Sequence, residues 1–242
     1  MKSLTSAACL LLGVLAGCHA TPENAVPTIA VASRAVPQAA LAPSKLDRLF
    51  VPDAVNGNVA WFESIAGPAI QVQDNGDGSK TRLYRVDGCH VATTTTRASI
   101  DTLTLQLGPH CSVPLEAMLP NAPALNLARL HFAELFKAGA SDIALTCAGF
   151  AECGASTDPS LQATLGGSHA DRFLSVEFSG RLTTDADVGA LQQVMDAEAK
   201  RLGKSGPDLT AEVYDRDPQL PALIRAVLGG VKVGYVTFRA SP

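Results

Sequence analysis

Alternating hydrophobic and polar residues predict a run of antiparallel strands in the first half of the chain. Residues 81–86, 89–96 and 100–107 are strand-like, and in the last range the leucines share one face while the threonines share the other. An Asp-Gly pair between the first two ranges is typical of a two-residue hairpin. A shorter strand is expected at residues 70–73. Together these ranges predict a β-meander that packs on one face and is hydrated on the other.

Helical spacing of apolar residues occurs before this meander and again after it. Residues 58–65 predict a short helix that turns Trp61 and Phe62 toward the core and stops at a Gly-Pro pair. Residues 125–137 predict a second helix. Strands are expected after it at residues 142–147, 161–165 and 173–182. The order of helix and meander therefore occurs twice, as in a degenerate duplication.

The last third of the chain is predicted to be rich in helix. Thr184 or Asp185 caps a helix that extends to residue 202, with Val188 in its apolar stripe. A helix that begins near Pro218 and a final strand over residues 231–239 are among the elements expected after it. The predicted fold class is α+β: helix plus antiparallel β-meander units, with a degenerate duplication as one interpretation, and with additional C-terminal helices and a final strand.

The first 18 residues carry a different pattern. One lysine is followed by an apolar run over residues 7–16, which is too short to span a membrane and has the layout of a secretory signal. Residues 15–18 read Leu-Ala-Gly-Cys and resemble the lipobox of bacterial lipoproteins. The resemblance implies that residues 1–17 are a removable signal peptide and that Cys18 carries the lipid. The alternative is an ordinary signal peptide cleaved nearby, with Cys18 as a stray thiol.

The residues after the lipobox bear on location and domain organisation. His19 follows the cysteine, whereas in diderm lipoproteins an aspartate there favours the inner membrane. The resemblance therefore implies a lipid anchor in the outer membrane, facing the periplasm. Proline-rich residues 19–44 show no periodicity and predict a disordered tether. The expected divisions are 1–17 (signal peptide), 18–44 (lipidated cysteine and tether), 45–120 (first helix-meander subdomain) and 121–242 (second α+β subdomain).

The other cysteines predict two disulfides in an exported chain. The meander brings the end of the strand over residues 100–107 back beside Cys89, which favours Cys89–Cys111. Cys147 and Cys153 then close a short loop. A metal site or a redox pair is the alternative, but neither spacing is Cys-x-x-Cys.

Composition and motifs limit the binding and catalytic activities that the sequence can support. The net charge of −4, without a basic stripe, disfavours nucleic-acid binding. Residues 166–170 approach a G-x-S-x-G nucleophile elbow, but a strand is expected after them and no histidine follows His169. His131 and Glu134 lie one helical turn apart, yet two ligands do not make a zinc site. No catalytic residue, metal site or cofactor is therefore assigned.

The turn at residues 74–78 is a further candidate site. Its carboxylates suit calcium, but the position two after Asp74 is a glycine, so a mobile hairpin loop is the favoured interpretation. Asp74 and Asp77 in this loop, and Phe150 inside the second predicted disulfide loop, are the candidate binding residues.

These observations favour a non-catalytic protein-binding module with a periplasmic protein partner: an inhibitor, an immunity protein or an envelope-assembly accessory. The element order is similar to that of BamE/SmpA-type envelope lipoproteins and of proteinaceous inhibitors such as the β-lactamase inhibitor protein. The alternative is a carboxylate-dependent envelope hydrolase, which requires two carboxylates about 5–10 Å apart. Its candidates are Glu63, Asp101, Asp171 and Glu177. A wall-binding structural lipoprotein is a third hypothesis.

Overall fold

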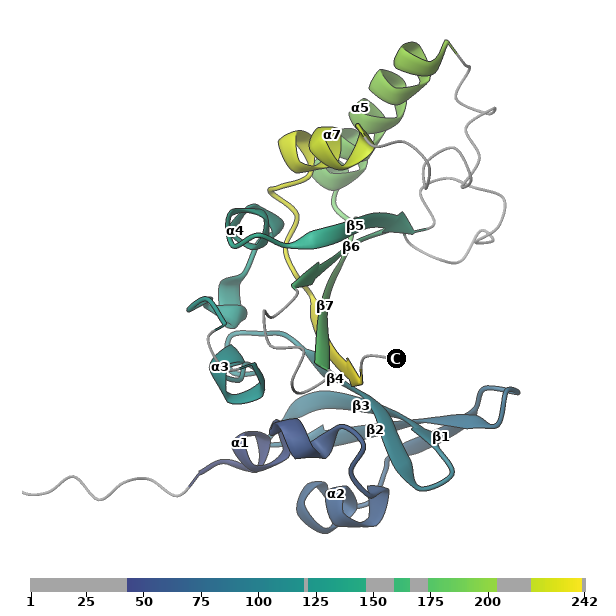
Figure 1. Cartoon of the computed structure of the whole chain (residues 1–242), viewed down its shortest axis with the longest axis vertical. Helices are drawn as coiled ribbons and strands as arrows, with labels where there is room; N and C mark the ends of the chain where they lie inside the picture. Colours follow the sequence, from purple (N-terminus) through teal and green to yellow (C-terminus); the bar gives the residue numbers. More distant parts are fainter. Residues whose placement is uncertain (1–42, 120–121, 147–158, 166–173, 204–218, 241–242) are drawn as a thin grey trace, which may run out of the picture. The chain divides into compact units, whose positions relative to one another are not determined.

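The computed structural model describes residues 43–119, 122–146, 159–165, 174–203 and 219–240. The first half of this part contains short helices followed by four strands (Figure 1). The elements are α1 (Lys45–Leu49), η1 (Pro52–Ala54), α2 (Val59–Ala66), β1 (Gln71–Asp74), β2 (Ser79–Val86), β3 (Cys89–Thr96) and β4 (Ser99–Gln106).

The second half also places short helices before strands, with two longer helices inserted before the last strand. The elements are α3 (Leu115–Met118), η2 (Leu127–Arg129), α4 (Phe132–Lys137), β5 (Ser141–Thr146), β6 (Ser160–Leu165), β7 (Leu174–Arg181), α5 (Asp185–Leu202), α7 (Leu220–Val227) and β8 (Tyr235–Ala240).

The eight strands form one antiparallel sheet in the order β1-β2-β3-β4-β8-β7-β6-β5. Each half runs inward from an edge, and the two halves meet where β4 pairs with β8. The C-terminal strand therefore completes the second meander and joins it to the first. This order confirms the predicted α+β class, with helix-plus-meander units, additional C-terminal helices and a final strand.

One face of the sheet, called the inner face here, supports the hydrophobic core. Tyr84, Leu105, Val176 and Phe238 are buried on it, from four different strands. The rings of Phe50, at the end of α1, and Phe238 on β8 lie 5.9 Å apart at an interplanar angle of 68°, an edge-to-face arrangement. Buried residues from both halves thus belong to one continuous core.

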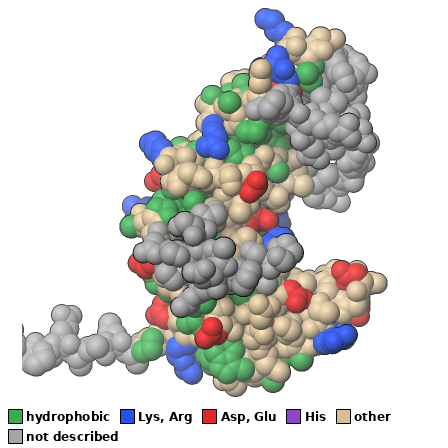
Figure 2. All heavy atoms as spheres, in the orientation of Figure 1, with side chains coloured by type: hydrophobic (Ala, Val, Ile, Leu, Met, Phe, Trp, Pro, Cys, Tyr) green, Lys and Arg blue, Asp and Glu red, His purple; other side chains and the backbone are tan. Residues whose placement is uncertain are grey.

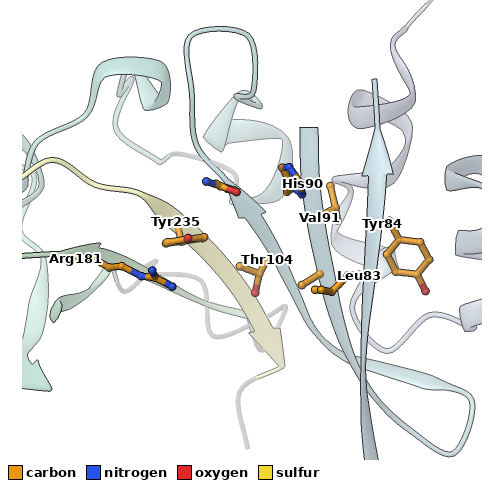
Figure 3. A pocket seen from close by; sticks show the side chains of 9 residues that line it. Leu83, Tyr84, His90, Val91, Thr104, Arg181 and Tyr235 are labelled. Carbon is orange, nitrogen blue, oxygen red and sulfur yellow. The ribbon is translucent and has the colours of Figure 1, made fainter. Parts of the chain in front are cut away.

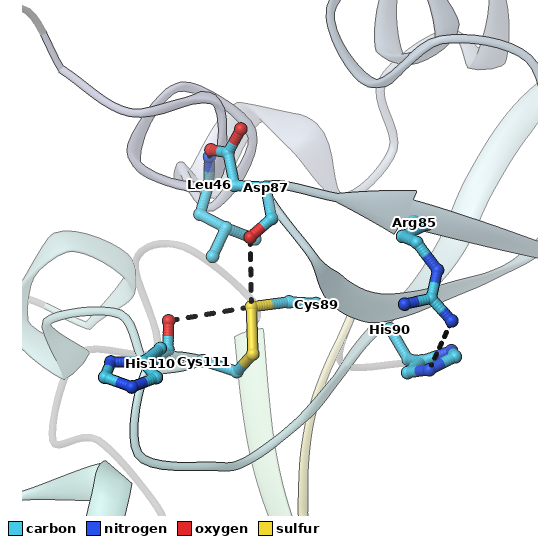
Figure 4. Close-up of a disulfide and its surroundings, with 7 residues drawn as sticks. All are labelled: Leu46, Arg85, Asp87, Cys89, His90, His110 and Cys111. Atoms are coloured by element: carbon cyan, nitrogen blue, oxygen red, sulfur yellow. Dashed lines mark hydrogen bonds between the residues drawn. A yellow bond between two sulfur atoms is a disulfide. The ribbon is translucent and has the colours of Figure 1, made fainter.

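The hairpin between β2 and β3 forms as the Asp-Gly pair predicts. Asp87 and Gly88 both have positive φ, at 50° and 84°, which a type I′ turn requires. The disulfide between Cys89 and Cys111 is present, with Cα atoms 5.5 Å apart (Figure 4). This pairing of the two cysteines is confirmed.

The helix predicted over residues 125–137 was too long. A 3₁₀ turn at η2 is followed by extended backbone at Leu130 and His131, and α4 begins only at Phe132. The reason is tertiary: the Leu130 carbonyl accepts a hydrogen bond from the Val233 amide at 2.9 Å, and the Phe132 amide donates to the Val231 carbonyl at 3.0 Å. These backbone groups bond to the segment that leads into β8 instead of extending a helix.

Side-chain directions on two helices also differ from expectation. In α2, Phe62 is buried but Trp61 is 40% exposed. In α5, Val188 is 50% exposed, and the buried stripe runs through Leu191, Val194 and Glu198. The cap of α5 is as predicted, because the Thr184 side chain accepts a hydrogen bond from the Asp187 amide.

Several sequence predictions concern residues outside the described ranges. These are the signal over 1–17, Cys18, the tether as far as residue 42, the Cys147–Cys153 pair, Phe150, residues 166–170 and Asp171. Among the helices that are described, none has both the length and the apolar composition needed to cross a bilayer.

Candidate functional site

The outer face of the sheet, opposite the core, carries the polar half of every alternating strand. Strand pairing places Thr94, Thr102, Thr104 and Thr237 on this face, each partly exposed in the middle of the sheet. Threonine suits this position because its branched side chain favours extended backbone while its hydroxyl remains available for hydrogen bonding. The alternation that buries leucines on one face therefore builds a hydrogen-bonding surface on the other.

The described short helices lie on the other side of the sheet. Figure 1 shows α1, α3 and α4 together on one side of the central strands β4, β8 and β7. Figure 2 shows that the surface is hollowed beside these strands and that hydrophobic side chains gather mainly over the helices. Among the described residues, the central strands are thus backed by the core on the inner face.

A hollow of about 340 Å³ lies where the two halves of the sheet meet (Figure 3). The residues lining it come from β2, β3, β4, β7 and β8, and are Leu83, Tyr84, His90, Val91, Ala92, Thr104, Gln106, Arg181 and Tyr235. Leu83 and Ala92 are cross-strand partners on the outer face, and Gln106 pairs with Tyr235 across the β4–β8 junction. The hollow therefore combines apolar contact surface with polar side chains from both halves.

Polar side chains on the outer face are linked across strands. The Arg85 guanidinium lies 3.2 Å from His90 Nε2, and the hydroxyls of Thr104 and Thr237 lie 2.9 Å apart. Because a guanidinium donates and does not accept, His90 Nε2 is the acceptor in the first pair. Such cross-strand bonds hold side chains of neighbouring strands in fixed positions.

Charge on this face is unevenly distributed. Glu177 forms an ion pair with Arg239, with 2.8 Å between Oε2 and the guanidinium nitrogen. None of the residues that line the hollow carries a carboxylate, whereas Arg181 is one of them and Arg85 contacts another. Among the described residues that line the hollow, the formal charge is therefore that of Arg181, on a chain whose net charge is −4.

A second polar group lies on the inner face, beneath α2. The Tyr84 hydroxyl donates to Glu63 Oε1 at 3.3 Å, and Arg82 lies 3.5 Å from the same oxygen. Burial, reinforced by the negative charge of Glu63, raises the pKa of Tyr84 to about 12. The tyrosine therefore stays protonated at neutral pH and joins the helix to the sheet.

The predicted loop residues Asp74 and Asp77 bond within their own turn. Asp74 Oδ1 accepts from the Gly76 amide at 2.9 Å, and Asp77 Oδ1 accepts from the Ser79 hydroxyl and amide at 2.6 and 2.8 Å. The bonds from Ser79 lower the pKa of Asp77, the hydroxyl having the larger effect. These carboxylates therefore stabilise the hairpin turn.

His131 and Glu134 meet, but as a helix cap. Glu134 Oε2 accepts from the His131 amide at 2.7 Å, and His131 Nδ1 lies 3.8 Å from the same oxygen. Across the described ranges, no group of three or more His, Cys, Asp or Glu side chains is arranged to hold a metal ion.

The carboxylates proposed for a hydrolase lie on different elements. Glu63 contacts the inner face through Arg82, whereas Glu177 is on the outer face. Asp101 accepts from the Thr96 hydroxyl at 2.7 Å, and strand β8 lies between the strands of Asp101 and Glu177. None of these three carboxylates is paired with another one.

Sequence reasoning did not single out His90, Arg181 or Tyr235 as binding residues, although all three are polar residues that line the hollow. The alternation over 173–182 and the final strand are enough to place Arg181 and Tyr235 on a polar face. The pattern does not show that β8 lies between β4 and β7. This strand order is what places Arg181 and Tyr235 in the same hollow as His90.

Comparison with known proteins identifies no family for this chain. No protein-family model matches the chain, and no curated protein matches it. Among solved structures, an extracellular protein containing a SCP domain from Bacillus anthracis is similar over 62% of this chain and 59% of that one. The identity is 11% and the TM-score is 0.33, values too low to bear on fold or function.

Proposed function

We propose that this chain is a non-catalytic, lipid-anchored periplasmic protein that binds a partner protein through the outer face of its sheet. The observation that carries the proposal is the hollow at the β4–β8 junction, on the polar face that lies opposite the core. Its lining includes an arginine and a tyrosine, residue types that dominate the energetics of protein interfaces.

The rigidity of this surface supports a non-catalytic binding role. The strands that carry the hollow are backed by fully buried side chains such as Leu105 and Phe238, so the face is preformed. The Cys89–Cys111 disulfide holds the end of the first hairpin to the segment after β4. A preformed face loses little conformational entropy when a partner binds to it.

The lipobox supports the proposed location. A lipidated Cys18 places the protein at the outer membrane, and the predicted tether gives the body reach into the periplasm. The disulfide agrees with an oxidising compartment.

The proposal is tested with the full, membrane-anchored chain carrying a C-terminal affinity tag. Ala92 lines the hollow, and Ala92→Arg fills it with a long side chain. Ala117 is exposed on α3, so Ala117→Arg adds the same side chain away from the outer face. Envelope proteins that co-purify are quantified by mass spectrometry for wild type and both variants.

The expected result is that wild type and Ala117→Arg enrich the same envelope protein and that Ala92→Arg loses it at least tenfold. The proposal is wrong if wild type enriches no protein over a tagged, unrelated lipoprotein. It is also wrong if Ala92→Arg keeps the partner while remaining folded by circular dichroism.

A further inference from the structure

We propose that the free edge of β1 is a second protein-binding surface, which an extended segment of a partner protein joins as an additional antiparallel strand. The segment carries a basic residue two positions before an apolar residue. The basic side chain lies beside Asp74, and the apolar side chain lies beside Val72. This inference goes beyond the proposed function, because it concerns the edge of the sheet and does not depend on the hollow at the β4–β8 junction.

The backbone of β1 offers hydrogen-bonding groups on the side away from β2. Among the described strands, β1 is the terminal one of the sheet and pairs only with β2. Next to β1, the Asn75 amide donates to the Ser79 carbonyl at 3.1 Å, which continues the register of the two strands. Hydrogen-bonded and non-hydrogen-bonded pairs alternate along an antiparallel ladder, so the amides and carbonyls of Val72 and Asp74 point away from β2.

The two edges of the sheet differ in regularity. β5, at the opposite edge, has a register shift between Ser141 and Ala144, and Asp142 within it has a φ of 46°. An irregularity of this kind obstructs pairing with a further strand. β1 keeps one register with β2 over Gln71–Asp74 and contains neither proline nor lysine. Of the two edges, β1 is therefore the one suited to accept another strand.

Apolar surface is exposed at the same edge. Val72 is 49% exposed, and Ile70, just before β1, is 62% exposed. Val72 lies opposite Arg82, which contacts Glu63 on the inner face of the sheet. A strand added beside β1 continues this face, so an apolar side chain opposite Val72 packs against it and removes it from water.

The charge around β1 indicates the second feature of the segment. Residues 50–79, which include α2, β1 and the turn after it, contain four carboxylates and no Lys, Arg or His. Asp74 is exposed, and among the described residues no ion pair engages it, although Lys80 is its cross-strand neighbour on β2. Because opposite charges at directly opposed strand positions stabilise pairing, a basic residue opposite Asp74 is favoured.

The same distribution of charge disfavours a second copy of this chain as the occupant. If β1 pairs with β1 of another copy, the residue opposite Asp74 comes from the same acidic range, which contains no cation. The alignment of Asp74 with its own counterpart opposes two like charges. The other edge strand, β5, also lacks a cation to place there. A partner protein that brings its own basic residue satisfies both the backbone and the charge.

The test is an NMR titration of the full chain with the capped peptide Ac-Thr-Lys-Thr-Val-Thr-NH2. Its lysine is designed to lie opposite Asp74 and its valine opposite Val72. The control peptide is N-methylated at the valine, which removes the N–H that donates to the Val72 carbonyl and keeps every side chain. Chemical shifts give the Kd, and amide hydrogen exchange at Val72 reports on backbone pairing.

Three variants of the protein separate backbone pairing from charge. Val72→Pro removes an N–H that β2 does not use, a substitution that edge strands tolerate, and circular dichroism confirms that the variant is folded. Asp74→Asn removes the charge beside the expected lysine. Asp196→Asn is the matched control, because Asp196 is an exposed aspartate on α5.

The expected result is that the peptide binds wild type and slows exchange of the Val72 amide by about tenfold or more. N-methylation of the peptide and Val72→Pro should each weaken the Kd at least tenfold. Asp74→Asn should weaken it at least threefold, and Asp196→Asn should leave it within about 1.5-fold of wild type.

Four outcomes would overturn the inference. One is the absence of binding at millimolar peptide, and another is equal binding of the N-methylated peptide, which would show that the backbone is not used. Equal weakening by Asp74→Asn and Asp196→Asn would mean non-specific charge attraction. Sedimentation that shows a dimer for wild type and a monomer for Val72→Pro would make a second copy the occupant. Each of these outcomes leaves the result for Ala92→Arg, and so the proposed function, unaffected.

Discussion

Asp87 Oδ2 accepts a hydrogen bond from the Lys45 amide at 2.9 Å and so ties the first turn of α1 to the β2–β3 hairpin. The Leu46 amide lies 3.4 Å from the same oxygen. The Asp87 carboxylate thereby accepts hydrogen bonds at the start of α1. Amides at the start of a helix lack intrahelical partners, and a negative charge is favoured there. One side chain at a local turn thus connects two elements that are 42 residues apart.

Replacing this carboxylate should loosen the first helix. We expect Asp87→Ala to lower the free energy of unfolding by about 1–2 kcal/mol, through the lost charge-assisted bond and the positive φ that alanine disfavours. Asp87→Asn keeps an oxygen acceptor and tolerates this backbone, so it should cost less than half as much. Urea unfolding followed by circular dichroism measures both. Equal losses in the two variants would contradict the role of the hydrogen bond.

Tyr84 should make stability depend on pH in the alkaline range. Its pKa is about 12 in the folded protein and 10.0 in the reference state. The unfolded chain therefore loses this proton first as the pH rises, and the stabilisation, complete below pH 10, falls by about 1.4 kcal/mol per pH unit between the two values. The measurement is urea unfolding at pH 9, 10, 11 and 12 for wild type and Tyr84→Phe. A difference between them that stays constant to pH 12 would refute the shift.

Gly180 should be intolerant of a side chain. A Cβ there would overlap the carbonyl oxygen of Lys232 and come within 3.0 Å of the Phe132 ring. Because backbone cannot give way as a flexible side chain does, we expect Gly180→Ala to destabilise by about 1–3 kcal/mol or more. Gly189, inside α5, faces open space, so Gly189→Ala should stabilise by about 0.5–1 kcal/mol. Thermal unfolding of the two variants should shift in opposite directions; a shared direction would be inconsistent with the close approach.

The Cys89–Cys111 disulfide should contribute measurably to stability. It closes a loop with a sequence separation of 22, for which about 2–4 kcal/mol is typical. The double variant Cys89→Ala/Cys111→Ala should therefore unfold at lower urea concentration than wild type. Wild type in a reducing agent should approach the same midpoint. A midpoint unaffected by removal of both cysteines would contradict this contribution.

The lipid anchor is tested at Cys18. We expect Cys18→Ser to release the protein from the membrane fraction and to block processing by the lipoprotein signal peptidase, because in our proposal the Cys18 thiol is the group that accepts the lipid. Fractionation and intact-mass measurement of wild type and the variant read out both effects. Unchanged membrane association of Cys18→Ser would disprove lipidation at this position.

The hairpins were predictable because their determinants are local. Alternation set which side chains share a face from β2 to β4, and the Asp-Gly pair placed the turn at residues 87–88. The Cys89–Cys111 bridge followed from the same local geometry. The prediction that Trp61 is buried was wrong. Helical spacing shows which side chains lie on one side of a helix but not how many of them are buried, and α2 buries Phe62, Ile65 and Ala66.

The candidate site was less predictable because its parts are distant in sequence. His90 and Arg181 line one hollow although 91 positions separate them, and no local pattern relates the two. The same is true of the break before α4, where Leu130 bonds to Val233 rather than continuing a helix. Tertiary hydrogen bonds decided both outcomes, and helix propensity was too weak to oppose them.

The amino-acid sequence by itself determined the strands, their turns, one disulfide and the division of each strand into an apolar and a polar face. Side chains alternate every residue along a strand, so this division needs no information from elsewhere. Only the tertiary structure decided that β8 lies between β4 and β7 and that the two polar faces form one surface with a hollow at their junction. The two halves pair because their apolar faces are buried together in one core. Burial of this kind involves the whole chain, so no single segment of the sequence predicts it.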